Sequence, residues 1–438
     1  MYLPRFIDNE LLTWKNETGR KPLLLRGARQ VGKSSAVRNL SKHFTYFIEL
    51  NFDENPGLSK LFDNNQSAED VCELISIYSK TPVVAGETLL FFDEIQSCIP
   101  AISMIRYFYE KKPDLHVIAA GSLLEFAMME IPSYAVGRVR SMFLFPFSFS
   151  EFLNAIDEDV LVKLIEKSDQ KKPINELIHQ KIIHYLRRFL IIGGMPEAVS
   201  VYKETGDLLK VQNILNDLII SFQEDFSKYK KKIRTASITE VLYAVIQQVG
   251  NKFTYSYPNS TQNNNQVKEM LALLQKAGLI IPVTHTSANG IPLGAETNPK
   301  KRKFLVLDTG IYQRALGLDL TRLFNEAPSG FVNRGSITEL HAGLEIVKNS
   351  SCYSKPELYY WQRDARNSQA EVDYIVQKQD EIIPIEIKAG TKGAMQSLYI
   401  FLKEKNIKKG IRCSLENFSE YESIEVIPLY AVGNIFKA

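Results

Sequence analysis

The amino-acid sequence predicts an α/β fold that is divided among several domains. At 438 residues the chain is too long for one ordinary domain, because domains usually span about 100 to 200 residues. Near its start an apolar strand, a glycine-rich loop and a helix follow one another, and a later apolar strand ends in two adjacent acids. Both patterns are typical of parallel sheets, which bind ligands at the carboxyl ends of their strands.

The composition is that of an ordinary globular protein, with 45% hydrophobic and 24% charged residues. A formal net charge of +3 does not by itself indicate a nucleic-acid or anionic-membrane partner. The four cysteines are far apart and form no Cys-x-x-Cys pair, which argues against a structural zinc site and against a disulfide framework. No run approaches the roughly 18 apolar residues that span a bilayer. We therefore expect a cytoplasmic protein without a membrane partner.

Residues 27–34 read GARQVGKS, which is a complete phosphate-loop pattern between a strand at 21–26 and a helix from Lys33. The glycines let backbone amides turn toward phosphate oxygens, Lys33 supplies a charge to the terminal phosphates, and the Ser34 hydroxyl can ligate Mg²⁺. The expected nucleotide-binding residues, including a later serine, are Gly27, Ala28, Arg29, Gln30, Val31, Gly32, Lys33, Ser34, Ser35 and Ser122.

The segment ETLLFFDEIQ predicts a buried strand that ends on Asp93 and Glu94. We expect Asp93 to hold Mg²⁺ through water and Glu94 to polarise the water that attacks the γ-phosphate. Two acids favour hydrolysis over phosphoryl transfer to a second substrate. A further strand, LHVIAAGS, brings Ser122 to the same edge, where a short polar side chain can sense the γ-phosphate.

Arg138 and Arg140 precede an aromatic-rich strand. An arginine near the nucleotide stabilises charge on the transferred phosphoryl group, and Arg138 is our candidate for this catalytic role. Pairing of either arginine with a surface acid is an equally good interpretation, and both stay open.

The segments LLLRGARQVGKSS, LLFFDEIQ, AAGSLLEFA, VGRVRSMFLFPFSFSEFL and GGMPEAV together resemble prokaryotic AAA-plus ATPases that carry a C-terminal domain of unknown function. The resemblance extends over nearly the whole chain. It implies ATP rather than GTP, and a core in which the phosphate-loop strand lies beside the strands that carry the acid pair and the sensor. It leaves open whether Arg138 acts within its own subunit or on a neighbour.

The middle of the chain has a helical pattern from about 151 to 229, followed by a basic run, 228–234. That run is interpreted as a solvated helix end, with a nucleic-acid contact as the alternative. A helix that ends at Gly278 and the β-rich segment behind it look like a winged helix, in which Lys301, Arg302 and Lys303 would contact phosphates. A winged helix that binds protein is the other interpretation.

Near the C-terminus, Glu386 and Lys388 lie two apart on a predicted strand and so face the same side, where Asp373 of an adjoining strand can join them. Two carboxylates suit Mg²⁺, and the lysine can orient the attacking water. This set resembles the PD-(D/E)xK nuclease core, although Val372 replaces the proline. The resemblance implies metal ligands Glu339, Asp373 and Glu386, with Glu345 as the alternative helix acid, and catalytic roles for Asp373, Glu386 and Lys388.

These patterns predict a P-loop (AAA-plus) ATP-binding core at 1–155, a helical lid or linker at 156–230, a winged-helix-like domain at 231–330 and a nuclease-like domain of restriction-endonuclease type at 331–438. We expect an ATPase that uses ATP and Mg²⁺ as a switch or motor to control the C-terminal module, acting on DNA. The alternative is a signalling or defence ATPase that binds a protein and retains an inactive nuclease-like remnant. A kinase that acts on a small substrate is the third interpretation, and the oligomeric state stays open.

Overall fold

The computed structural model describes residues 2–62, 66–122, 124–128, 137–229, 234–256, 262–319, 335–364, 370–391 and 393–436. The chain forms two compact units. The first contains Met1–Phe145 together with two short segments from later in the chain, Lys276–Gly278 and Ser351–Lys355. The second contains Pro146–Gln275, Leu279–Ser350 and Pro356–Ala438.

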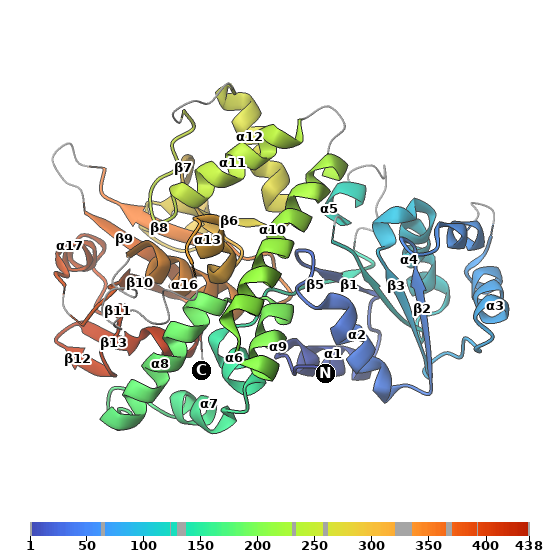
Figure 1. The fold of residues 1–438 in the computed structure, drawn as a ribbon, viewed down its shortest axis with the longest axis horizontal. Helices are drawn as coiled ribbons and strands as arrows, with labels where there is room; N and C mark the ends of the chain where they lie inside the picture. The colour runs from blue at the N-terminus through green and yellow to red at the C-terminus, as the bar shows by residue number, and fades with distance from the viewer. Residues whose placement is uncertain are drawn as a thin grey trace. The chain divides into compact units, whose positions relative to one another are not determined.

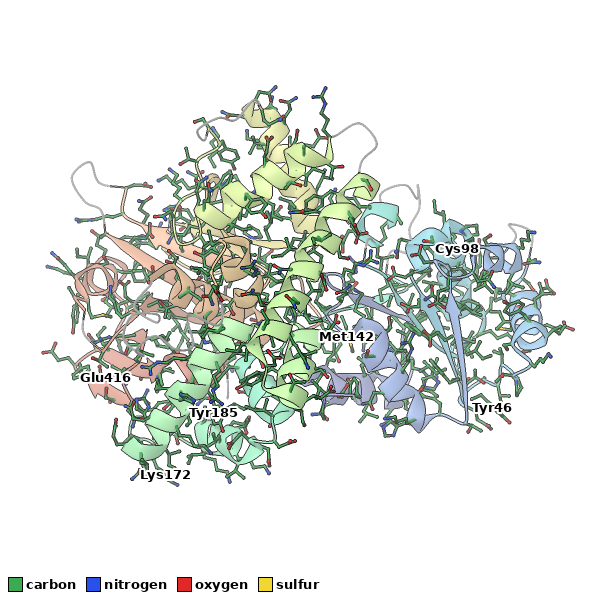
Figure 2. All side chains as sticks on the ribbon, viewed as in Figure 1. Tyr46, Cys98, Met142, Lys172, Tyr185 and Glu416 are labelled. Atoms are coloured by element: carbon green, nitrogen blue, oxygen red, sulfur yellow. The ribbon has the colours of Figure 1, made fainter. Side chains whose placement is uncertain are left out.

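The first unit is built on a five-stranded parallel sheet of order β2-β3-β4-β1-β5. Its strands are β1 (Leu23–Arg26), β2 (Tyr46–Asn51), β3 (Thr88–Asp93), β4 (His116–Ala120) and β5 (Arg140–Phe143). Every residue of β3 and β4 is buried, as expected for central strands covered on both faces. Figure 2 labels Tyr46 of β2 and Met142 of β5, which are the two edge strands.

Helices cover both faces of this sheet. They are α1 (Ile7–Asn16), α2 (Lys33–Leu40), α3 (Ala68–Ser79), α4 (Ile99–Lys111) and the short α5 (Leu124–Ala127). Leu24, Leu90 and Phe92 pack with buried side chains of α3 and α4 in one hydrophobic cluster. Figure 1 shows α1 and α2 on the other side of the sheet. This is the predicted α/β core.

The strand order corrects one implication of the family resemblance. The phosphate-loop strand β1 lies directly beside β4, which carries the sensor, as expected. The acid-pair strand β3 is not its neighbour, because β4 lies between them. Adjacent strands in a sheet are about 4.8 Å apart, so the acids reach the loop across the width of one intervening strand.

The second unit is rich in helices, and those in its N-terminal part confirm the helical pattern that the sequence predicts from about 151 to 229. The helices of this unit are α6 (Phe149–Ala155), α7 (Asp159–Glu166), α8 (Glu176–Ile192), α9 (Pro196–Thr205), α10 (Leu208–Tyr229), α11 (Thr235–Gln247), α12 (Asn264–Lys276), α13 (Thr309–Ala315), α16 (Gly335–Lys348) and α17 (Gln396–Lys405). Helices α8, α9 and α10 contact one another (Figure 1). None of the described helices is long and apolar enough to cross a membrane.

An eight-stranded mixed sheet of order β12-β13-β11-β10-β9-β8-β6-β7 organises the rest of this unit. The strands are β6 (Ile280–Thr286), β7 (Thr297–Val306), β8 (Leu358–Gln362), β9 (Glu371–Lys378), β10 (Glu381–Ile387), β11 (Gly410–Ser414), β12 (Ser419–Tyr421) and β13 (Ile424–Pro428). The hairpin β6–β7, which the sequence assigned to a separate winged-helix domain, continues this sheet because β6 pairs in parallel with β8. The expected boundary at about 330 therefore does not divide two sheets.

Asp308 joins the segment GGMPEAV, which the sequence singled out, to the turn before α13. Its Oδ2 accepts a hydrogen bond from the Gly194 amide at 2.6 Å, and its Oδ1 accepts one from the Ile311 amide at 3.1 Å and so caps α13. A Cβ on Gly193 would lie 2.1 Å from Oδ1, which explains the glycine. Both segments are structural: they fix α8 against α13.

Candidate functional site

The phosphate loop connects β1 to α2, as the sequence predicts. Gly27, Gln30 and Gly32 have positive φ angles of 149°, 63° and 96°, which fold the backbone back on itself before the helix begins. A Cβ on Gly27 would lie 2.2 Å from the carbonyl oxygen of Leu144, so only glycine fits there. The loop ends at the N-terminus of α2, where free backbone amides and the helix dipole favour a phosphate.

Lys33 lies inside this loop. Its side chain is buried, and its ammonium donates to the carbonyl oxygens of Gly27 at 3.0 Å and Ala28 at 2.7 Å. Burial lowers the pKa of Lys33 to about 8, although the nearby carboxylates of Glu94 and Asp93 raise it. The ammonium is therefore poorly neutralised without a further anion, and a triphosphate is the anion that this position suits.

The acid pair lies where β3 ends. The buried Asp93 carboxyl lies close enough to the Ser34 side chain for that side chain to influence its pKa, so the two predicted Mg²⁺ ligands are brought together. Burial raises the pKa of Asp93, and the Ser34 hydroxyl opposes that rise. Glu94 follows in the left-handed region with φ 47°, and its amide donates to Asp93 Oδ1 at 3.1 Å. Hydroxyl and carboxylate oxygens fit Mg²⁺.

Gln96 is a residue of this site that sequence reasoning missed. Its Nε2 donates to Glu94 Oε2 at 2.5 Å and so orients the candidate base. A Cβ on Gly121 would lie 1.9 Å from Gln96 Oε1, so the glycine makes room for this side chain. Gly121 follows β4 directly, and the predicted sensor Ser122, which is buried, comes next. The segment DEIQ contained the signal, because Gln96 follows the acid pair closely.

Arg5 is the second missed residue. Its side chain is 7% exposed, and its guanidinium donates to the carbonyl oxygens of Val31 at 3.1 Å and Phe145 at 2.7 Å. It therefore links the phosphate loop to the segment that follows β5. No motif marks Arg5, because its partners are backbone atoms far away in the sequence.

The two candidate arginines form ion pairs within the first unit. Arg138 donates to Glu110 of α4, and Arg140 donates to Glu17. Both side chains are at least partly exposed, so these pairs contribute little stability. This arrangement is the one that the surface-pair interpretation describes. A catalytic role for Arg138, on the nucleotide of its own subunit or of a neighbouring subunit, stays a prediction.

The second candidate site lies on the eight-stranded sheet. The register of β9 with β10, continued by one step past Tyr374, brings Asp373 opposite Glu386, as expected. The Ile387 amide donates to Asp373 Oδ2 at 2.7 Å, and the Lys388 ammonium donates to Glu386 Oε1 at 2.7 Å. The other oxygen of Glu386, Oε2, is buried and has no hydrogen-bond partner among the described residues.

Lys303 enters this cluster from β7, and the expectation that it contacts phosphate as part of a wing is wrong. The residue is only 2% exposed. Its ammonium lies 2.9 Å from Glu339 Oε1 and 2.5 Å from Glu371 Oε1. Burial alone lowers the pKa of Lys303, but the carboxylates of Glu339, Glu371 and Asp373 raise it above its ordinary value.

The structure distinguishes the two candidate helix acids on α16. Glu339 joins the cluster, whereas Glu345 accepts a hydrogen bond from the Phe149 amide at 3.1 Å, at the start of α6. Burial and the Asp373 carboxylate both raise the pKa of Glu339 and of Glu386, while Lys303 opposes the rise at Glu339 and Lys388 opposes it at Glu386. Glu345 therefore anchors one helix to another and is not part of the acid cluster.

The three predicted metal ligands, Glu339, Asp373 and Glu386, have different partners in the structure. Among the described residues, no group of three or more His, Cys, Asp or Glu side chains gathers as metal ligands do. Glu339 forms an ion pair with Lys303, whereas Asp373 and Glu386 lie opposite each other on β9 and β10. The roles of Glu339, Asp373, Glu386 and Lys388 in metal binding and cleavage thus stay predictions.

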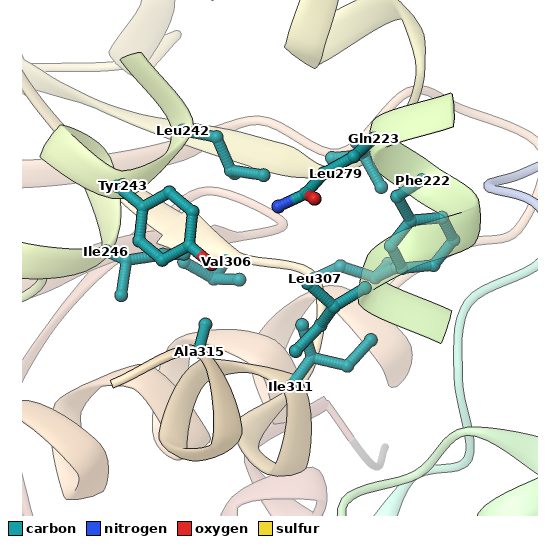
Figure 3. A pocket seen from close by; sticks show the side chains of 11 residues that line it. Phe222, Gln223, Leu242, Tyr243, Ile246, Leu279, Val306, Leu307, Ile311 and Ala315 are labelled. Carbon is teal, nitrogen blue, oxygen red and sulfur yellow. The ribbon is translucent and has the colours of Figure 1, made fainter. Parts of the chain in front are cut away.

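A separate apolar pocket lies in the second unit between α10, α11, α13 and β7 (Figure 3). Gln223 and Tyr243 are the polar side chains among those that line it. The lining includes no charged group, so it offers neither an acid nor a base for catalysis.

The fold and the phosphate-loop geometry define the class of the first unit. Residues 19–153 match the family model of the AAA domain, which agrees with the parallel sheet and the phosphate loop of this part of the chain. Two further family models match, both domains of unknown function: DUF8612 over residues 183–322 and DUF4143 over residues 334–432. None of the curated proteins compared with the chain matches it.

Several solved structures are similar at low sequence identity. A Walker-type ATPase of Pyrococcus abyssi is 14% identical, with 72% of this chain and 96% of that chain covered and a TM-score of 0.46. The Orc1 protein of Aeropyrum pernix in complex with DNA is 12% identical, with coverages of 74% and 96% and a TM-score of 0.30. Drosophila ORC bound to DNA is 11% identical, with coverages of 73% and 95% and a TM-score of 0.29.

Proposed function

We propose that the chain is an AAA-plus switch that hydrolyses ATP, and that its nucleotide state controls the module built on the eight-stranded sheet, which acts on DNA. The observation that carries this proposal is the position of Gly278. This residue forms the turn between α12 and β6, yet it belongs to the first unit, where it lies against the phosphate loop.

Gly278 packs against Ala28 with little free space. Its φ is 74°, and a Cβ built on it would lie 3.2 Å from the Ala28 backbone nitrogen and 3.4 Å from the Ala28 Cα. Ala28 is one of the residues whose amides face the phosphates in a loop of this type. A change in the loop on nucleotide binding therefore displaces the turn from which β6 begins. This supports a switch in which β6 and β7 respond to ATP.

The ATP step follows from the geometry of the loop. The Lys33 ammonium exchanges its bonds to Gly27 and Ala28 for bonds to the terminal phosphates. Ser34 and Asp93 would hold Mg²⁺, which neutralises charge on the phosphate oxygens when bound. Glu94, oriented by Gln96, accepts the proton of the attacking water. Hydrolysis then returns Lys33 to the loop carbonyls and resets the turn.

DNA as the target is supported by basic side chains on the edge strand β7. On β7, Lys300 is exposed and Arg302 is half-buried. The exposed Lys252 lies beside this strand, in the loop after α11, where the next residue, Phe253, donates its amide to the Arg302 carbonyl oxygen at 2.8 Å. Such side chains neutralise phosphates of nucleic acid without reading its sequence. The basic run 228–234 was the other candidate contact, and most of it lies outside the described residues.

A protein partner is the second candidate, and Lys303 favours it. A lysine that engages Glu339 and Glu371 leaves the nuclease-like cluster without its three-carboxylate set. A module of this kind can still bind a partner through its surface. The two candidates differ in salt dependence, because binding to DNA phosphates weakens steeply with salt.

The test is reciprocal coupling between ATP and DNA. Wild-type protein should bind duplex or single-stranded DNA with an affinity that changes about fivefold or more when ATP is added, and DNA should change ATP affinity by the same factor. Gly278→Ala should break this coupling, because its Cβ pushes on Ala28. Fluorescence anisotropy of labelled DNA measures the affinity, and gel analysis of the same DNA reports any cleavage.

Gly317→Ala is the matched control. Gly317 has φ 78° and no atom within 4 Å of an added Cβ. Gly317→Ala therefore introduces the same kind of backbone strain as Gly278→Ala, but no close contact like the one with Ala28. The control variant should couple ATP to DNA as the wild type does. DNA binding that is independent of ATP in the wild type contradicts the switch. Absence of DNA binding at low salt, with ATP turnover intact, assigns the module to a protein partner.

A further inference from the structure

Lys303 connects three elements of the second unit through one buried ammonium. It lies on β7, and it pairs with Glu339 of α16 at 2.9 Å and with Glu371 of β9 at 2.5 Å. The ring of Tyr360 on β8 lies under the same ammonium, 5.2 Å from its centroid. The lysine side chain is 3% exposed, and those of Glu339 and Glu371 are 14% and 29% exposed.

A lysine in this position requires its partners. Moving an ammonium out of water is unfavourable by several kcal/mol, and only nearby carboxylates and hydrogen bonds offset this. The carboxylates in turn need a nearby cation, because they lie close together and repel one another. They are those of Glu339, Glu371, Asp373 and Glu386. Divalent metals commonly meet this need. Here the Lys303 ammonium meets it at Glu339 and Glu371, and Lys388 pairs with Glu386.

The lysine and the acids come from two different regions of the sequence. Lys303 belongs to the stretch that matches DUF8612, while the acids belong to the stretch that matches DUF4143. Lys303 can reach them because β6 pairs with β8 and so extends the sheet to β7. The charge of one matched region is thus balanced by the other.

We infer that Lys303 is the resident cation of this acid cluster and takes the place of a divalent metal ion at Glu339. The ion pairs tie β7 to α16 and β9, and they engage the helix acid that a three-carboxylate metal site would use. The module therefore folds without a divalent metal and does not cleave DNA while Lys303 is in place. This inference does not rest on ATP hydrolysis or on the coupling proposed above.

The test is the response of full-length, nucleotide-free protein to Mn²⁺. Wild type should melt at the same temperature in EDTA and in Mn²⁺. Lys303→Met leaves Glu339 and Glu371 unpaired, so the melting temperature of the second unit should fall by roughly 10 °C. Mn²⁺ should then restore part of the loss, because the acids need a cation and binding to the folded state stabilises it.

Lys301→Met is the control for this substitution. Lys301 lies two residues away on the same strand and pairs with the exposed Asp364, so its loss should leave the melting temperature within about 2 °C of wild type. A Lys303→Met variant that is as stable as wild type and indifferent to Mn²⁺ overturns the inference.

Calorimetric titration of wild type with Mn²⁺ keeps the inference testable if Lys303→Met fails to fold. The comparison is with Asp373→Asn, which leaves the Ser34 and Asp93 positions untouched. Titration curves that coincide support Lys303 as the resident cation. Mn²⁺ binding by wild type that Asp373→Asn abolishes overturns it, because a metal then occupies the cluster with Lys303 present.

Discussion

At the residue scale, two glutamates on the same helix have different roles because different polar groups reach them. Glu339 and Glu345 were equivalent candidates in the sequence, since both lie on α16 and either could face β9. Glu339 meets the Lys303 ammonium, whereas Glu345 meets the Phe149 amide. Strand periodicity predicted that Glu386 and Lys388 face the same side, where Asp373 of an adjoining strand can join them. The sequence contained no signal for partners that arrive from distant elements.

Glu345 makes the stability of the second unit depend on pH. Burial raises its pKa from 4.5 to about 7, so the native state keeps a proton that the unfolded state releases. This contribution is fully present below pH 4.5 and is lost as pH rises through about 7, which amounts to about 3 kcal/mol. Glu345→Gln should flatten that part of the stability curve, measured by urea unfolding at successive pH values.

Glu381→Gln, an exposed position on β10, is the control and should leave the pH dependence as in wild type. A Glu345→Gln variant with the wild-type slope between pH 4.5 and 7 would show that Glu345 is ionised in the native state. The proposed anchoring of α16 to α6 would then involve a charge rather than a neutral carboxyl.

At the scale of elements, the strand, loop and helix around the phosphate site were predictable because their residues are contiguous. Gly27, Gly32 and Lys33 specify the loop by local conformation and charge, and β3 is recognisable as an apolar run ending in acids. Gln96 and Arg5 were not recognised, because their functions depend on approaches from elsewhere. Gly121 shows the same limit: its need for glycine appears only when Gln96 lies beside it.

Arg5 should control nucleotide affinity although it lies outside every motif. Arg5→Met removes the donors to the Val31 and Phe145 carbonyl oxygens and frees the loop to adopt other conformations. A charged hydrogen bond contributes about 1.5 to 3 kcal/mol, so ATP affinity should weaken about tenfold or more. Titration with a fluorescent ATP analogue measures this change.

Arg106→Met, on the exposed side of α4, provides the comparison, because Arg106 contacts Glu110 and the Tyr107 ring of its own helix and makes no described contact with the phosphate loop. Its ATP affinity should equal that of wild type. If Arg5→Met also binds ATP as wild type does, the loop holds its conformation without Arg5.

At the scale of the whole molecule, the α/β core with its parallel sheet was predictable, while the pairing of distant strands was not. The sequence predicted a β-rich segment behind Gly278, but nothing local indicated that its strand β6 pairs with β8, about 75 residues later. The basic residues near Lys303 therefore suggested a DNA-binding wing. Residues that are basic in sequence can be buried counter-ions once long-range pairing places acids beside them.

The return of the chain to the first unit was also beyond sequence reasoning. Lys276–Gly278 and Ser351–Lys355 belong to that unit, although each lies between elements of the second. Gly278 was recognised only as a helix end. Its contact with Ala28 depends on tertiary packing, and it is the feature on which the proposed switch rests.

The central claim is that the loop at 27–34 and the acid pair after β3 bind and hydrolyse ATP. Its most direct test is Mg²⁺-dependent ATP turnover together with ATP binding, for wild type, Lys33→Ala and Glu94→Gln. Wild type should hydrolyse ATP, Glu94→Gln should bind ATP but turn over at least about a hundredfold more slowly, and Lys33→Ala should lose both activities. Wild-type protein that fails to bind ATP with Mg²⁺, or Glu94→Gln that hydrolyses at the wild-type rate, would contradict the account.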